Sequence, residues 1–112
     1  MKRVEKPWGE ELWLANNEFY ACKIIKVKKG TRTSLQYHRY KHETIYIDEG
    51  KVKAMLEDET GRMVEKILNP GDIIENKPYR KHRIEALEDT RLIEVSTPQL
   101  DDVVRVEDDY RR

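Results

Sequence analysis

The sequence predicts an all-β domain, either a sandwich or a closed barrel, on three observations. Short runs rich in Val, Ile and Tyr recur along the chain, and turn residues separate them at regular spacing. No segment before Thr97 shows the apolar stripe of a helix, which repeats about every 3.6 residues. The chain has 112 residues, enough for one modest core, so we expect a single domain over 1–112.

The expected strands follow one another along the chain. Val52, Ala54 and Leu56 alternate with charged residues, which indicates one buried and one solvated face. Asn69-Pro70-Gly71 suits a type II turn, because proline fixes the first φ angle and glycine accepts a positive φ at the next position. A final hairpin is expected around 88–90. The runs expected to be extended are 19–28, 31–37, 44–47, 52–56, 63–68, a strand beginning at 73, 83–87 and 91–96.

The two ends of the chain are expected to lie outside this series of strands. We interpret residues 1–18 as an N-terminal arm and 97–112 as a C-terminal tail. The tail is acidic and then basic, and its composition does not choose between a short helix and an extended segment. Trp8 either lines the mouth of a site or plugs the end of the barrel, since tryptophan buries a large area.

The charge balance limits the classes of partner. The 22 basic and 22 acidic residues cancel, which argues against a field that attracts nucleic acid or an anionic membrane. A local patch would have to bind any anionic partner. The single cysteine, Cys22, excludes an internal disulfide and favours an intracellular protein. No apolar run has the length of a membrane span or a signal peptide, so we expect a soluble, cytoplasmic protein.

Four side chains form a candidate metal site. Gln36 and His38 are two positions apart, so in a strand they face the same way, and Glu43 follows after a short break. His82 comes from a distant segment. An amide oxygen, two imidazoles and a carboxylate suit one divalent ion, with Zn first and Fe, Mn, Co or Ni also compatible. Isolated histidines are also common as plain surface residues. His42 is expected to face solvent, although it competes with Tyr40 as an extra ligand.

Glycine spacing around the first histidine strengthens the metal hypothesis. Gly30 precedes His38, Glu43 follows it by five residues, and Gly50 ends the segment. This pattern resembles the first motif of the cupin superfamily, whose fold is a double-stranded β-helix, a jelly-roll-like barrel. Tyr40 stands where that motif has its second histidine. The resemblance implies that Gln36 completes the ligand set in its place.

A second glycine-containing segment extends the resemblance. Gly71 and His82 have the outer spacing of the second cupin motif. Lys77 and Tyr79 replace the proline and glycine of that motif, with Pro78 between them. The resemblance therefore covers both metal-binding segments, with departures in each.

Further segments resemble a narrower family, the type II mannose-6-phosphate isomerases. They occur in the same order over nearly the whole chain: 4–10 (Val-Glu-Lys-Pro-Trp-Gly-Glu), 34–38 (Ser-Leu-Gln-Tyr-His), 82–85 (His-Arg-Ile-Glu), 93–95 (Ile-Glu-Val) and 102–110 (Asp-Val-Val-Arg-Val-Glu-Asp-Asp-Tyr). This resemblance implies interconversion of mannose 6-phosphate and fructose 6-phosphate by a metal held by Gln36, His38, Glu43 and His82. The family closes on Tyr-Gly-Arg, where this chain has Tyr110-Arg111-Arg112.

Sugar-phosphate chemistry needs cations for the phosphate. The candidates are Arg105, from the family's tail motif, then Arg32, Arg80 and Lys6, although most such residues are solvated in a chain with 39% charged residues. The catalytic base is not fixed by the sequence. Glu10, Tyr46, Lys53 and Glu85 are its candidates.

Two other functions stay open besides the isomerase. The chain is alternatively a non-catalytic sugar- or nucleotide-sugar-binding cupin, consistent with Tyr40, or another metal-dependent cupin enzyme such as a dioxygenase. The expected partner is a small anionic sugar phosphate, with neither nucleic acid nor membrane. A homodimer is expected, because a short barrel leaves strand edges that can pair.

Overall fold

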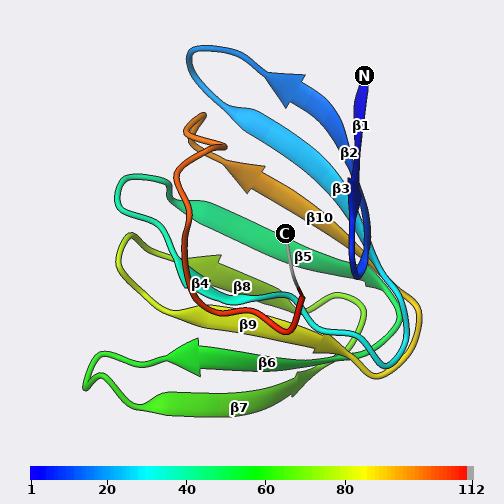
Figure 1. The fold of residues 1–112 in the computed structure, drawn as a ribbon, viewed down its shortest axis with the longest axis vertical. Helices are drawn as coiled ribbons and strands as arrows, with labels where there is room; N and C mark the ends of the chain where they lie inside the picture. Colours follow the sequence, from blue (N-terminus) through cyan, green and yellow to red (C-terminus); the bar gives the residue numbers. More distant parts are fainter. Residues whose placement is uncertain (111–112) are drawn as a thin grey trace.

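The structure, a computed structural model, describes residues 1–110, which form two antiparallel sheets that face each other (Figure 1). One sheet has the strand order β1-β2-β3-β10-β5-β8 and the other β11-β4-β9-β6-β7. Among the described residues, no helix is long and apolar enough to cross a membrane. The strands are β1 (Lys2–Lys6), β2 (Gly9–Asn16), β3 (Ala21–Val27), β4 (Leu35–Tyr37), β5 (Glu43–Glu49), β6 (Val52–Glu57), β7 (Met63–Leu68), β8 (Ile73–Asn76), β9 (His82–Ala86), β10 (Thr90–Ser96) and β11 (Val104–Glu107).

The order of the strands confirms the all-β prediction and corrects one hairpin. The predicted hairpin around 88–90 is wrong, because β9 and β10 belong to different sheets. Leu87 N donates to Lys51 O at 2.9 Å, which holds this turn against the turn at Gly50 and directs the chain across. Gly50 has φ +94°, and a Cβ there would lie 2.5 Å from Asp89 O, so the close approach requires glycine.

The barrel expected from the sequence is not closed. Each described strand pairs within its own sheet, and no ladder joins the two sheets. β8 has four residues and pairs only with β5, so its other edge stays open. The molecule is therefore an open jelly roll of two sheets with space between them.

Both ends of the chain take part in the sheets. The residues interpreted as an N-terminal arm form β1 and β2, at one edge of the six-stranded sheet. The C-terminal tail is extended and forms β11, which pairs with β4. Arg111 and Arg112 of the predicted tail lie outside the described residues.

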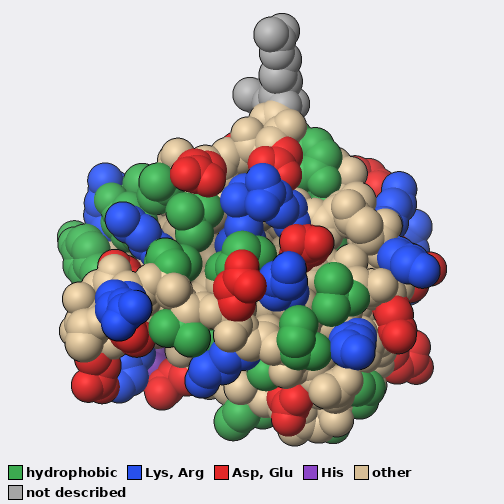
Figure 2. All heavy atoms as spheres, turned by 90° about the horizontal axis from the view of Figure 1, so that it is seen from below, with side chains coloured by type: hydrophobic (Ala, Val, Ile, Leu, Met, Phe, Trp, Pro, Cys, Tyr) green, Lys and Arg blue, Asp and Glu red, His purple; other side chains and the backbone are tan. Residues whose placement is uncertain are grey.

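The apolar core fills one end of the space between the sheets. Trp8 is buried within it, as the plug interpretation requires, and also lines the adjoining cavity. On the outside, Figure 2 shows basic and acidic side chains interspersed among hydrophobic ones on the face seen from below, with no field of one sign there. The core consists of Trp8, Ile25, Val27, Ile45, Ile47, Val52, Ala54, Leu68, Ile74, Ile84, Ala86 and Leu92.

Candidate metal centre

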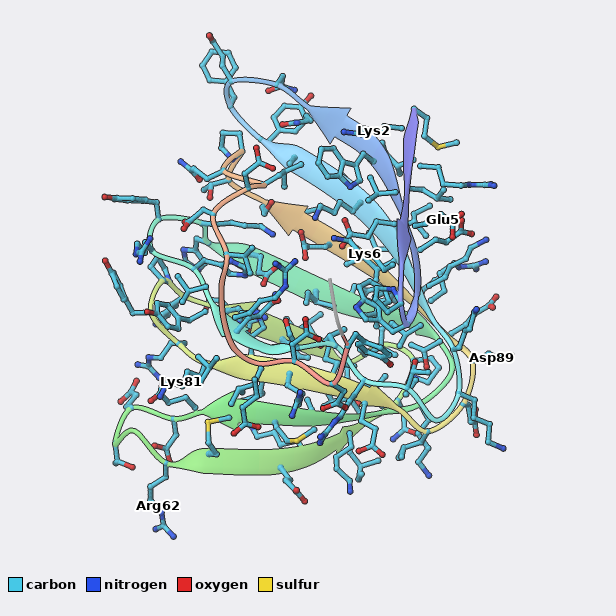
Figure 3. All side chains as sticks on the ribbon, viewed as in Figure 1. Lys2, Glu5, Lys6, Arg62, Lys81 and Asp89 are labelled. Atoms are coloured by element: carbon cyan, nitrogen blue, oxygen red, sulfur yellow. The ribbon has the colours of Figure 1, made fainter. Side chains whose placement is uncertain are left out.

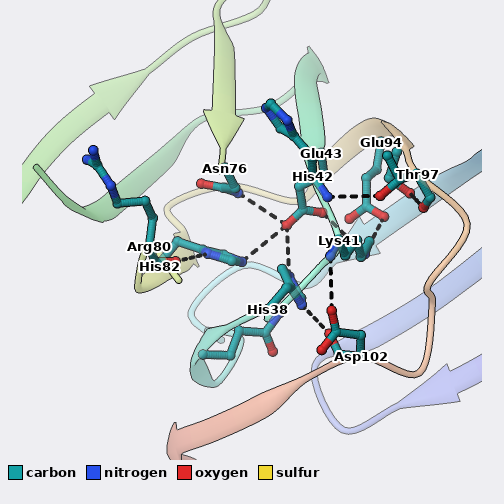
Figure 4. A network of polar contacts seen from close by, with 12 residues as sticks. His38, Lys41, His42, Glu43, Asn76, Arg80, His82, Glu94, Thr97 and Asp102 are labelled. Atoms are coloured by element: carbon teal, nitrogen blue, oxygen red, sulfur yellow. Dashed lines mark hydrogen bonds and ion pairs between the residues drawn. The ribbon is translucent and has the colours of Figure 1, made fainter. Parts of the chain in front are cut away.

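Three of the predicted ligands meet at the other end of this space (Figure 4). Glu43 Oε1 lies 3.1 Å from His38 Nε2 and 3.2 Å from His82 Nε2. All three side chains are buried, and their ligand atoms lie within 4.8 Å of one another. Glu43 begins β5 and His82 begins β9, while His38 follows β4 directly. Two facing sheets thus bring together residues that are far apart in the sequence.

Backbone carbonyls orient both imidazole rings. Nδ1 of His38 contacts Asp102 O at 2.5 Å, and Nδ1 of His82 contacts Arg80 O at 3.0 Å. A carbonyl oxygen can only accept, so the proton of each neutral ring lies on Nδ1. Each Nε2 therefore carries a lone pair that points toward Glu43. This is the arrangement in which histidine binds metals.

The lone pairs that meet between His38, Glu43 and His82 repel one another unless a positive charge lies among them. Two Nε2 atoms and Glu43 Oε1 are all acceptors, so either protons or a shared cation must lie among them. His82 Nε2 is buried and makes no hydrogen bond. Ligands about 2.1 Å from one tetrahedral zinc ion would lie about 3.4 Å apart, close to the observed separations. His38, Glu43 and His82 therefore fit a divalent metal ion.

A turn in a strained conformation positions His82. Tyr79 has φ +66°, in the left-handed region that residues other than glycine rarely adopt. It stands at the position of the glycine in the second cupin motif, and glycine adopts this region without steric cost. Tyr79 N donates to His38 O at 2.6 Å, which ties this turn to the segment of the other histidine. The strain therefore lies at the site, where such outliers commonly occur.

The C-terminal segment fixes the loop between the two first-motif ligands. The carboxylate of Asp102 accepts hydrogen bonds from the backbone N–H groups of residues 39, 40 and 41. Burial acts to raise the pKa of Asp102, but these hydrogen bonds outweigh it and lower the pKa below its ordinary value. Asp102 thus holds both this loop, through its side chain, and His38, through its carbonyl.

Buried charges of alternating sign continue from the metal ligands into the sheet. Lys41 Nζ lies 3.4 Å from Glu43 Oε2 and 3.0 Å from Glu94 Oε2. Burial opposes ionisation of Glu43, but a hydrogen bond with Glu94 and the charge of Lys41 hold its pKa well below its usual range. Burial and the neighbouring Glu43 carboxylate raise the pKa of Glu94 to about 8. Glu43 is therefore the carboxyl group of this pair that ionises at the lower pH.

The ligand cluster lines a small cavity that opens into a larger groove. The cavity has a volume of about 100 Å³ and the groove about 600 Å³. Lys6 lies on the side of β1 that faces this space (Figure 3). The two share the lining residues Lys6, Glu11, Lys23, Leu100, Val103 and Arg105, so they form one continuous site.

The other residues predicted for the site divide into two groups. Gln36, Lys6 and Arg105 line the cavity. Gln36 is directly opposite both His82 and Arg105 in the sheet, and paired residues project to the same face. Arg32 instead forms a two-point ion pair with Asp109. The side chain of Arg80 lines a separate hollow, so neither arginine side chain lines the cavity of the metal ligands.

Residues weighed as extra ligands or as the base lie elsewhere. His42 is exposed and bonds Glu75 at 2.8 Å, as its expected solvent-facing position implies. Tyr40, at the place of the missing histidine, is also exposed. None of the candidate bases Glu10, Tyr46, Lys53 and Glu85 lines the cavity.

Several residues of the site were not foreseen from the sequence. Asn76 donates to Glu43 Oε1 at 3.3 Å, and Lys23 and Glu94 face the cavity. The sequence contains a signal for Lys23 and Glu94. Lys23 is two positions before Ile25, and Glu94 is two positions after Leu92, in the same strands. In a strand, residues two apart face the same side, so apolar neighbours at that spacing indicate an inward charge.

Solved structures with the same arrangement define the class of fold. KdgF from Halomonas sp. is 21% identical with a TM-score of 0.78, over 90% of this chain and 91% of that one. A mutant of oxalate decarboxylase OxdC from Bacillus subtilis is 19% identical with a TM-score of 0.83, over 94% of this chain. CapF in complex with an inhibitor is 16% identical with a TM-score of 0.79, over 95% of this chain. These similarities establish the cupin fold predicted from the sequence.

The family follows from a second comparison. The chain belongs to the family described as mannose-6-phosphate isomerase C-terminal, whose family model matches residues 1–108. No curated protein matches the sequence. The chain spans 30% of the OxdC chain and 34% of the CapF chain.

Proposed function

We propose that this chain is a metal-dependent sugar-phosphate isomerase that interconverts mannose 6-phosphate and fructose 6-phosphate. The observation that carries the proposal is the continuity between the His38–Glu43–His82 cluster and a groove whose lining includes Lys6 and Arg105. Membership of the mannose-6-phosphate isomerase C-terminal family supports the choice of substrate. One site thus combines groups for the sugar end and groups for the phosphate end.

The sugar end would lie at the metal ligands. We propose that His38, Glu43 and His82 hold a divalent ion, with Gln36 as a fourth ligand and zinc as the first candidate, since the donors are nitrogen and oxygen. A bound divalent ion polarises the sugar oxygens and stabilises the negative charge of an enediolate. Buried Lys41 stays charged, because Glu94 and Glu43 raise its pKa against the effect of burial. The positive charge of Lys41 adds to that stabilisation.

The phosphate end would lie in the groove. Arg105 projects to the same face as Gln36 and forms no ion pair with any described residue from 1 to 110. Lys6 lines the same passage from the opposite side, on β1. An arginine that is not neutralised is suited to a two-point contact with phosphate. We therefore assign phosphate binding to Arg105 and Lys6, and not to Arg32 or Arg80.

Turnover with defined metals tests the proposal. The protein is stripped with chelator, loaded with Zn²⁺, Mn²⁺, Co²⁺, Ni²⁺ or Fe²⁺, and assayed for conversion of mannose 6-phosphate. We expect turnover that chelator abolishes and that His38→Ala lacks, while the exposed His42→Ala retains it. Absence of turnover with every metal would contradict the isomerase.

A non-catalytic sugar-phosphate-binding protein is the second candidate. Tyr40 favours it, because this exposed side chain stands at the position of a histidine in the first cupin motif and adds no group to the metal ligands. Thermal stabilisation by mannose 6-phosphate without turnover would support this alternative. Oxygen uptake by the iron-loaded protein would instead indicate a dioxygenase.

A further inference from the structure

A row of buried charges joins the groove to the metal ligands, and the proposed function does not use all of it. Lys23 Nζ lies 3.1 Å from Glu11 Oε1 and 4.0 Å from Glu94 Oε2. Lys41 then bridges Glu94 and Glu43. The signs alternate from Glu11 in the groove to Glu43 at the ligands. Each charge in the interior has a partner, which offsets part of its cost of burial.

The inner members of this row are occupied with one another. Lys41 contacts Glu94 and Glu43, so both of these carboxyl groups are engaged in ion pairs. Glu43 is a candidate metal ligand. None of the three is therefore a free proton acceptor for a substrate.

Glu11 differs from them in its position and its contacts. It is 8% exposed and lines both the cavity and the groove, at the junction where a bound sugar would extend from metal to phosphate. Trp13 Nε1 and Lys23 Nζ both donate to its Oε1, at 3.0 and 3.1 Å. Both of these hydrogen bonds end on Oε1, and neither uses the other oxygen, Oε2.

The surroundings of Glu11 favour its ionised form. Burial acts to raise its pKa, but the charge of Lys23 and the hydrogen bond from Trp13 outweigh burial and lower the pKa. Lys23 also lies over the Trp13 ring, 5.1 Å from its centroid, so the three side chains fix one another. A fixed carboxylate at the mouth of the cavity can accept a proton without rearrangement.

We propose that Glu11 is the catalytic base that transfers the proton between C2 and C1 of the sugar. This inference rests on the proposed isomerase function. Glu11 Oε2 removes the C2 proton, the C2–H electron pair forms the C1=C2 bond, and the carbonyl electron pair moves to O1. A proton passes from O2 to O1, and Glu11 returns its proton to C1 as the C2 carbonyl forms. Lys23 and Trp13 are positioning residues for this carboxylate.

Glu11→Gln tests the role of the base with little disturbance of structure. Glutamine keeps an oxygen for the hydrogen bonds from Trp13 and Lys23 but cannot accept the C2 proton at neutral pH. We expect kcat to fall by about 100- to 10,000-fold with little change in KM. Incorporation of deuterium from D₂O into the sugar at C1 and C2 should fall in parallel. Glu11→Asp, which keeps a carboxylate, should recover part of the activity.

The matched control is Glu10→Gln, one residue earlier on the same strand. Glu10 pairs with Arg3 and Lys26 outside the cavity, so turnover should stay at the wild-type level. Stabilisation by Zn²⁺ should be the same in all variants, which excludes loss of the fold. An active wild type with an equally active Glu11→Gln variant would overturn this inference alone. An inactive wild type would overturn the proposed function and this inference with it.

Discussion

The two ends of the space between the sheets are equally buried but chemically opposite. On β10, Leu92 is 1% exposed where the apolar core meets the cavity, and Glu94 is 5% exposed within the cavity. On β5, Ile47 belongs to the apolar end and Glu43 to the charged end. The same strands therefore build a dry core and a charged site a few residues apart. Burial by itself does not distinguish a residue that stabilises the fold from one that serves the site.

The apolar end supplies most of the favourable free energy of folding. Burial of apolar area contributes about 25 cal/mol per Å², so the twelve-residue apolar cluster supplies the favourable term. Buried charges at the other end lose hydration, and pairing at best balances that loss. We therefore expect substitutions at the apolar end to change the stability of the fold, and substitutions at the charged end to change ligand binding.

Removal of a metal ligand should have the largest effect. His82→Ala should lower zinc affinity by more than about 100-fold, since loss of an outer partner of a ligand alone costs about 10- to 100-fold. Zinc at 100 times Kd stabilises a folded protein by about 2.7 kcal/mol, and the variant should lose this gain. Thermal unfolding with and without Zn²⁺ measures it, with the exposed His42→Ala as control. Equal zinc stabilisation in both variants would contradict the site.

A cavity at the apolar end should have the opposite profile. Ile47→Ala should lower the free energy of unfolding by about 2–5 kcal/mol, because it removes buried methyl groups and leaves a void away from the metal cavity. Its zinc affinity should equal that of the wild type. Urea unfolding and zinc titration measure the two quantities, and Leu14→Ala, at an exposed position, should change stability by less than about 0.5 kcal/mol. A large loss of zinc affinity in Ile47→Ala would show that the two ends are coupled.

The same contrast explains what the sequence could and could not predict. The strands from 19 to 96 were predicted closely, because alternation and turn residues act locally. His38, Glu43 and His82 were predicted because the spacing of the cupin motifs encodes their meeting. The hairpin around 88–90 was predicted wrongly, since contacts with the turn at Gly50, distant in sequence, decide which sheet the chain enters.

The partners of charged residues that face inward are harder to predict from the sequence. The sequence indicates that Lys23 belongs to an extended run, but it does not indicate that its partner is Glu11, twelve residues away. Arg32 and Arg80 have the chemistry of phosphate ligands, but pairing with Asp109 and a position in another hollow place them elsewhere. The pairing of charged side chains depends on which strands lie side by side in the folded chain, and the local sequence does not contain that information.

The exposed ion pair of Arg32 and Asp109 differs from the buried row of charges in its contact with solvent. Arg32 holds Asp109 at the C-terminal strand, and this hydrogen bond lowers the pKa of Asp109 below its ordinary value of 3.8. A lowered carboxyl pKa stabilises the fold above pH 3.8, and that stabilisation is lost as pH falls through the folded-state pKa. In Arg32→Gln, the free energy of unfolding should therefore decrease less between pH 6 and pH 3 than in the wild type.

Because the Arg32–Asp109 pair is exposed, this effect should be the smallest of the three. Urea unfolding of the metal-free protein at both pH values measures it, with Arg62→Gln as control, and parallel pH dependence in wild type and Arg32→Gln would refute it.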